Sequence, residues 1–219
     1  PVVKEILVPR RAAPYRSAGC LRAGTPINAL LLACGAGGKY GYYDLPDLPQ
    51  VAAEVVDVCA HLRAAAQAGT LAIDRILVLT DLPDLTVAGA TVKAATEDSV
   101  GQALRGELET DYHLLHHSGH YSYGASDATS GLLLPAGEKK LALLSLPALF
   151  QQLESRPIEF AFFNGCSSGN HGEAGLQYLG AAFTCLTAGV AAVVGMRWPM
   201  LDHEACALAI QFYSELAQS

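Results

Sequence analysis

Short, continuous apolar runs alternate with longer amphipathic stretches along most of this chain. The short runs suit strands that are buried on both faces, and the longer stretches have the period of a helix. Strands that alternate with helices need crossover connections, which produce a parallel sheet covered by helices on both faces. We expect five strands, at 27–33, 75–79, 112–116, 158–163 and 190–195. We expect five helices, several opening on Ser, Thr or Asp, at 48–66, 96–109, 145–154, 173–187 and 202–217.

The chain length and the remaining segments indicate one α/β domain. A chain of 219 residues is long enough for a single domain with a rigid core. Residues 1–25 have no clean period and are expected to form an arm or edge element, with the domain at 26–219. Two apolar runs between Gly131 and Leu144 predict a hairpin inserted beside the sheet. The chain opens on Pro1 and ends inside an amphipathic stretch, so we expect it to be a piece of a larger protein.

Charge and hydropathy exclude two classes of partner. The net charge is -7, and the 14 Lys and Arg residues do not cluster on one face, so no direct nucleic-acid partner is expected. The most apolar stretches, 29–33 and 188–196, are far shorter than the ~20 residues of a membrane span. The N-terminus also lacks a signal pattern. We therefore expect a cytoplasmic protein with no membrane partner.

One of the six cysteines differs from the rest in its surroundings. The six are scattered and form no CxxC pair, which indicates free thiols in a reducing compartment. Most lie in apolar periodic segments, where cysteine acts as a small buried hydrophobe, but Cys166 is flanked by small polar residues. Cys166 is therefore the candidate for chemistry.

Two polar turns follow the third and fourth predicted strands, at 116–121 and 164–169. Ligands bind beyond the carboxyl ends of the strands in such sheets. If these strands are neighbours, a thiol and an imidazole meet there, an arrangement that activates a nucleophile. The N–H groups of Gly165 and Cys166 are candidate donors to an oxyanion. His171 and His203 also lie after strands and are rival bases to His120.

Six stretches occur in an order that resembles the CHAT domains, bacterial relatives of caspases and separase: HHSGHYSYG, SGLLL, FFNGCSSG, EAGLQYLGAAFTCLTAG, AAVVGMRWPMLDHEA and FYSEL. The resemblance covers most of residues 27–219 and implies a caspase-like three-layer sandwich. It places the catalytic histidine on His120 and the catalytic cysteine on Cys166. It implies a cysteine endopeptidase that acts on protein or peptide substrates without a cofactor. The alternative is a catalytically silent interaction domain, but retention of both residues favours the peptidase.

The chain departs from the family pattern directly after His120. The family usually has Gly there, and its N–H commonly belongs to the oxyanion hole, whereas this chain has Tyr121. Any residue except proline still supplies that N–H. Only a short loop separates Ser167 from the predicted helix near Glu173, so there is no linker of the kind that caspases cut on activation. The resemblance therefore implies activation by a regulatory partner or an adjacent sensor domain.

The resemblance gives conflicting indications of substrate preference. Asp202 matches an acidic residue of separase, which implies a basic side chain before the cut bond, whereas Arg197 resembles the arginine by which caspases hold aspartate. Basic-specific relatives have a second acid two residues before the cysteine, where this chain has Asn164. We expect cleavage after Arg or Lys, with Asp44 or Asp47 as further wall residues of the pocket.

Two other patterns are weaker. The histidines of 113–120 suggest a metal site, but strand residues three or four apart do not share one face, and the HExxH pattern is missing. We expect no metal there and expect His113 and His116 to be structural. The segment 35–38 lacks the GxGxxG spacing of a dinucleotide site, which makes a nicotinamide enzyme a distant alternative. In the caspase-like interpretation this loop forms a wall of the substrate cleft.

Overall fold

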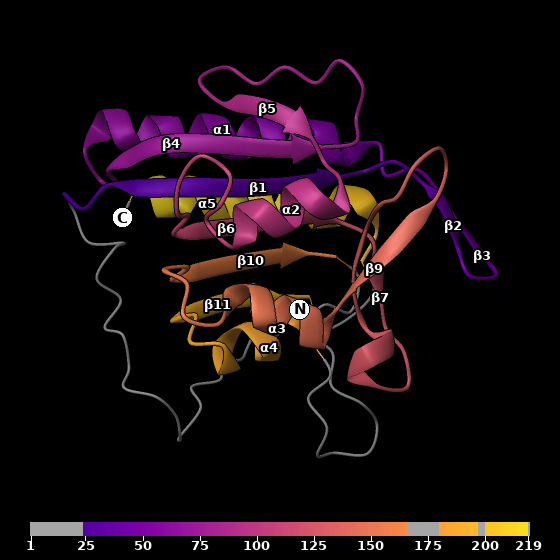
Figure 1. The fold of residues 1–219 in the computed structure, drawn as a ribbon. Coiled ribbons are helices and arrows are strands. Elements are labelled where there is room, and N and C mark those ends of the chain that lie inside the picture. The colour runs from indigo at the N-terminus through magenta and orange to yellow at the C-terminus, as the bar shows by residue number, and fades with distance from the viewer. Residues whose placement is uncertain (1–23, 166–179, 197–199, 219) are drawn as a thin grey trace.

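The centre of the fold is a six-stranded parallel sheet with the order β11-β10-β6-β1-β4-β5 (Figure 1). The structure is a computed structural model and describes residues 24–165, 180–196 and 200–218. The strands are β1 (Ile27–Cys34), β4 (Ile73–Thr80), β5 (Thr91–Ala94), β6 (Leu114–Gly119), β10 (Phe160–Asn164) and β11 (Ala192–Gly195). After β1 the chain adds β4 and β5 on one side of it, and then β6, β10 and β11 on the other side. The strand order therefore reverses between β1 and β6.

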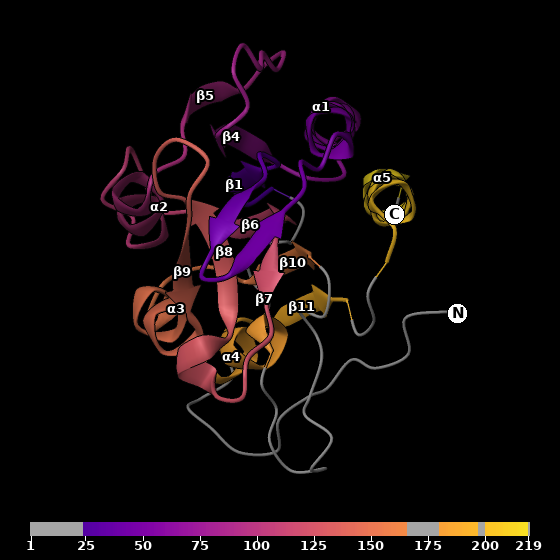
Figure 2. The same ribbon diagram turned by 90° about the vertical axis from the view of Figure 1, so that its right-hand side faces the viewer.

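Helices cover both faces of this sheet, which confirms the predicted three-layer α/β sandwich. One face carries α1 (Gln50–Ala68) and α5 (Asp202–Gln218), and the other carries α2 (Glu97–Leu104), α3 (Leu146–Leu153) and α4 (Ala181–Thr187) (Figure 2). Because strand side chains alternate, β1 sends Leu31 into the core under α1 and α5 and Leu30 into the opposite core. No helix in the part of the chain that the structure describes is both long and apolar enough to cross a membrane.

The five predicted strands are present, but two features of the sheet were not predicted. The first is β5, a short edge strand with two exposed and two half-buried residues. The second is the position of β6, which was expected at 112–116 and extends instead to Gly119. The segment 116–118 is therefore strand and not turn, because β6 lies between β1 and β10 and is paired on both sides.

Helix α2 shows how the local sequence sets an end. The Thr96 hydroxyl accepts a hydrogen bond from Ser99 N, and the Ser99 hydroxyl accepts one from Thr96 N, so the predicted Thr cap is confirmed. The helix stops at Leu104 and not at 109 as predicted, and Gly106 follows it with a φ of 70°.

Two small antiparallel elements lie beyond the carboxyl ends of the parallel strands (Figure 1). One is the hairpin of β2 (Gly38–Tyr40) and β3 (Tyr43–Leu45). The other is a sheet of β7 (Tyr121–Ser122), β8 (Gly131–Pro135) and β9 (Leu141–Ser145), with the 3-10 turn Asp127–Thr129 between β7 and β8. The β8–β9 pair is the inserted hairpin predicted from the sequence. These elements border the edge at which the predicted chemistry lies.

Candidate functional site

His120 and the residue before Cys166 follow two strands that are direct neighbours in the sheet. In the register of β6 and β10, Ser118 pairs with Asn164. Gly165 is so close to the end of β6 that a Cβ added to it would lie 2.9 Å from Gly119 O and 3.4 Å from Tyr121 Cβ. The sequence-based expectation that the two strands adjoin is confirmed. Cys166, Arg197 and His171 lie outside the described residues.

The imidazole of His120 is held by a backbone carbonyl from the loop between β3 and α1. His120 Nε2 lies 2.8 Å from Pro46 O. A carbonyl oxygen can only accept, so Nε2 carries the hydrogen and Nδ1 has the free lone pair of a base. A base oriented by a third group is the usual arrangement for activating a nucleophile. Sequence reasoning assigned this loop to the cleft wall but missed the Pro46 carbonyl, since a backbone acceptor leaves no pattern in the side chains.

Asp81 is a second residue that the sequence interpretation missed. It follows β4 directly, and its two carboxylate oxygens accept hydrogen bonds from Gly35 N at 2.9 Å and Ala36 N at 3.2 Å. Burial raises the pKa of the Asp81 carboxyl, while these hydrogen bonds and the charge of His120 act in the opposite direction. The signal available in the sequence was an acid immediately after a buried strand, at the same edge of the sheet as His120.

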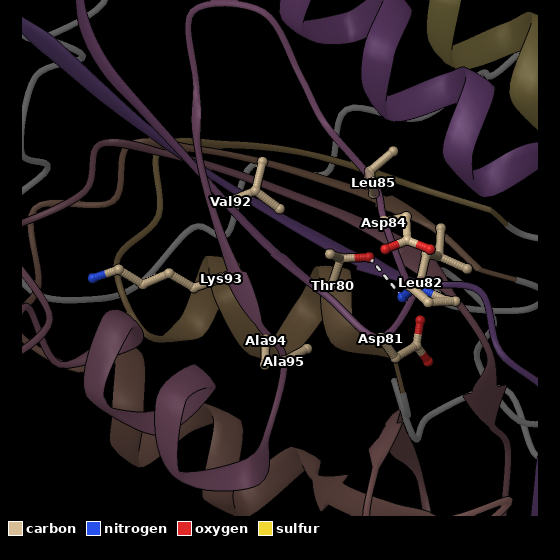
Figure 3. Close-up of a pocket in the computed structure, with 10 residues that line it drawn as sticks. Thr80, Asp81, Leu82, Asp84, Leu85, Val92, Lys93, Ala94 and Ala95 are labelled. Atoms are coloured by element: carbon tan, nitrogen blue, oxygen red, sulfur yellow. Dashed lines mark hydrogen bonds between the residues drawn. The ribbon is translucent and has the colours of Figure 1, made fainter.

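A hollow of about 370 Å³ lies beside Asp81, at the carboxyl ends of β4 and β5 (Figure 3). Leu82, Leu85 and Val92 give it apolar walls, and Lys93 on its border forms an ion pair with Glu109. The Asp81 carboxylate is already bonded to the turn after β1. The hollow lies at the β4–β5 end of the sheet, and His120 is not among the residues that line it.

The two histidines inside β6 are buried on opposite faces of the sheet. His116 Nε2 lies 2.9 Å from Glu54 Oε1 on α1, while His117 packs against Phe163 of the other core. Within the described residues neither ring nitrogen of His117 has a hydrogen-bond partner. Burial, with the nearby charges of His116 and His120, lowers the pKa of His117 to about 3. His117 is therefore neutral at physiological pH and adds no positive charge beside His120.

The expectation that His113 and His116 are structural is confirmed. His113 Nδ1 accepts a hydrogen bond from Asn28 N at 3.1 Å, and His116 is bonded to Glu54. In residues 24–165, 180–196 and 200–218, no three His, Cys, Asp or Glu side chains are placed to hold a metal ion. His203, the rival base, is exposed on the first turn of α5.

The structure describes four of the residues that were predicted to line the substrate pocket, and they lie in different parts of the fold. Asn164 is buried and donates from Nδ2 to Glu54 Oε2 at 2.7 Å. Asp202 accepts from Gln50 N, the first residue of α1, at 2.9 Å. Asp44 is exposed in β3 opposite Lys39, and Asp47 accepts from Gly37 N at 2.7 Å. Asp202 and Asn164 thus both contact α1, whereas Asp44 lies in β3 and Asp47 in the loop between β3 and α1.

The two oxyanion candidates that the structure describes, Tyr121 and Gly165, lie at the junction of β6 and β10. Tyr121 opens β7 immediately after His120 and pairs with Leu132. Burial raises the pKa of the Tyr121 phenol, and a hydrogen bond with the Ala181 backbone partly offsets this. The Tyr121 side chain therefore reaches from the end of β6 to the first residue of α4. Gly165 lies against the same segment, as described above.

The other cysteines that the structure describes have the features of unreactive thiols. Cys34, Cys59, Cys185 and Cys206 are buried, as expected from their apolar surroundings. Burial raises the thiol pKa of Cys59 to about 12 and that of Cys206 to about 11. A thiol of this kind is almost entirely protonated at neutral pH and is a poor nucleophile.

A comparison with protein families matches residues 29–219 to the CHAT domain. The chain belongs to the CHAT domain family. The match includes the strand that leads to His120, the sequence segment that contains Cys166 and the segment that contains Asp202. A search of curated proteins gave no match. CHAT domains are associated with caspase-like cysteine peptidases, and the six-stranded parallel sheet between two helical layers agrees with the caspase-like sandwich.

Proposed function

We propose that this CHAT domain is a cysteine endopeptidase with Cys166 as the nucleophile and His120 as the base. The observation that carries the proposal is the hydrogen bond from His120 Nε2 to Pro46 O, which leaves Nδ1 free at the end of the strand beside Gly165. Gly165 directly precedes Cys166 in the chain. Family membership supports the same pair of residues.

The reaction proceeds in two halves. The Cys166 sulfur attacks the carbonyl carbon of the scissile peptide bond, and His120 accepts the thiol proton. N–H groups of Tyr121, Gly165 and Cys166 stabilise the negative charge on the carbonyl oxygen. The C–N bond then breaks, and His120 gives its proton to the leaving amine. Water attacks the resulting thioester, which releases the carboxylic acid and restores the thiol.

Covalent labelling tests this proposal. A peptidyl acyloxymethyl ketone with Arg or Lys before the reactive group is expected to modify Cys166 within minutes, as followed by mass spectrometry of the intact chain and its peptides. Cys59 and Cys206 serve as internal controls, because their buried thiols have raised pKa values and should stay unmodified. If Cys166 reacts no faster than these two, both in the chain alone and in the presence of its activating partner or neighbouring domain, the chain is instead a silent interaction domain.

Activation is proposed to come from a regulatory partner or a neighbouring domain that orders the loops of the cleft. The short segment between Ser167 and Glu173 supports this, since it offers no linker of the caspase kind. In the labelling experiment the reactive chain should therefore have its full mass. If Cys166 becomes reactive only after an internal cut, this form of activation is wrong.

We further propose that the enzyme cleaves after Arg or Lys and that the Asp202 carboxylate attracts the basic side chain, with Asp44 as a wall residue. Arg197 supports the rival preference for Asp. The N-cap residue of α1 is Pro49, whose side chain cannot accept a hydrogen bond from the helix. Asp202 instead caps α1, because its carboxylate accepts from Gln50 N. A test must therefore separate the charge of Asp202 from its capping role.

A peptide-library profile of the wild type, Asp202→Asn and Asp202→Ala makes that separation. Asparagine still accepts the Gln50 N–H but has no charge, whereas alanine loses both roles and should cost about 1 kcal/mol of stability. We expect both variants to lose the basic preference and only Asp202→Ala to melt at a lower temperature. A profile dominated by Asp, or a basic preference that survives Asp202→Asn, would show that the pocket is assigned wrongly.

A further inference from the structure

The Asp81 carboxylate joins the ends of two neighbouring strands. Its Oδ1 accepts from Gly35 N and its Oδ2 from Ala36 N, so both oxygens bind successive N–H groups of the turn after β1. Hydrogen bonds to an ionised acceptor are stronger than those between neutral groups. An asparagine at this position would have only one acceptor oxygen. The acid therefore gives each N–H group an oxygen of its own, which asparagine cannot do.

The turn that Asp81 holds is packed directly on the backbone that carries the Pro46 carbonyl. Gly35 O accepts from Leu48 N at 2.7 Å, and Gly37 N donates to Asp47 Oδ1 at 2.7 Å. A Cβ added to Gly37 would lie 2.5 Å from the carbonyl carbon of Pro46. No side chain fits there without moving one of the two segments. The positions of the 35–37 turn and of the Pro46 carbonyl are thus fixed together.

Asp81 also acts on His120 through its charge. The charge of His120 lowers the pKa of the Asp81 carboxyl, which means that the two groups interact across the edge of the sheet. His117, another titratable group on which the charge of His120 acts, is neutral at physiological pH.

We propose that Asp81 is a positioning residue for His120: it fixes the 35–37 turn, the turn fixes the Pro46 carbonyl, and the carbonyl holds the imidazole with Nδ1 free. The catalytic consequence rests on the proposed peptidase function. The structural part does not, because the hydrogen position on the His120 ring can be measured in the absence of any substrate.

The experiment is two-dimensional NMR of protein labelled with 15N in the histidine rings, at a pH where the rings are neutral. The His120 signals are identified by their loss in His120→Gln. In the wild type His120 should show a single tautomer with hydrogen on Nε2. In Asp81→Ala we expect a mixture of tautomers, because the Pro46 carbonyl is no longer held.

Asp84→Asn is the matched control, since Asp84 lies three residues further on the same loop, is exposed, and has a φ of 61° that asparagine tolerates.

A second readout concerns catalysis. Asp81→Ala should lower kcat by about 10- to 100-fold with KM nearly unchanged, since a misplaced base affects the chemical step more than binding. Asp81→Glu keeps the charge and should recover part of the loss, and Asp81→Asn is used if the alanine variant does not fold. A His120 tautomer that stays the same in Asp81→Ala and Asp81→Asn overturns the inference. If the His120 tautomer shifts in Asp81→Ala but the wild-type protein never cleaves peptides, the positioning role is supported and the peptidase proposal is overturned.

Discussion

Replacing His120 by glutamine is expected to lower kcat/KM for peptide cleavage by about a thousandfold, because a positioned general base contributes roughly 10²- to 10⁴-fold. Glutamine is the informative substitution, since its amide can still donate to Pro46 O but cannot take a proton from a thiol. His120 is half-buried, and glutamine can keep its hydrogen bond to the loop before α1. The melting temperature should therefore change little, and the loss should appear in kcat.

The control for this prediction is His203→Gln. His203 follows the last strand, which made it a rival for the role of base in the sequence analysis. It is exposed on α5. Its replacement should leave kcat/KM within about twofold of the wild type, as for most exposed residues away from a site. His171→Gln completes the comparison. Activity that persists in His120→Gln but collapses in either of the other two variants would transfer the role of base to that histidine.

The sequence was sufficient to predict the layers and to place His120 and Gly165 after neighbouring strands, because both follow from local periodicity. Buried strands such as β1 are apolar throughout, and amphipathic stretches such as α5 follow them. The error at the end of β6 has a physical cause. His116 and His117 were taken for a turn because polar residues usually are, yet His116 is paired with Glu54, 62 residues earlier in the chain. A partner so far away along the chain cannot be identified from the local pattern of residue types.

The parts of the site that the sequence did not indicate all involve the backbone. Pro46 acts through its carbonyl, and Asp81 acts on the N–H groups of Gly35 and Ala36. Every residue has such groups, so residue type alone does not mark them. Asp202 illustrates the converse: its residue type suggested a binding pocket, but its bond to Gln50 N shows a structural role as well, because Pro49 provides no side-chain cap for α1.

Replacing Glu54 by alanine is expected to destabilise the domain by about 3 to 5 kcal/mol, the usual cost of removing one partner from a buried polar pair. Glu54 is only 2% exposed, and its two oxygens bind His116 Nε2 at 2.9 Å and Asn164 Nδ2 at 2.7 Å. The alanine variant leaves both donors buried without an acceptor, and each such group is costly. Urea denaturation at neutral pH measures the difference. Asp57→Ala, an exposed carboxylate on the same helix, should cost less than about 0.5 kcal/mol.

A second pair of variants separates the charge of Glu54 from its hydrogen bonds. Glu54→Gln keeps a carbonyl oxygen that can accept from Asn164 while its amide faces His116, whose ring can change tautomer and accept. Its cost should therefore be well below that of Glu54→Ala. The double variant Glu54→Leu/His116→Leu removes donor and acceptor together and should be less destabilised than the sum of the two single leucine variants, because neither group is then left buried alone. If Glu54→Ala is no less stable than Asp57→Ala, the buried carboxylate does not hold β6 and β10 against α1.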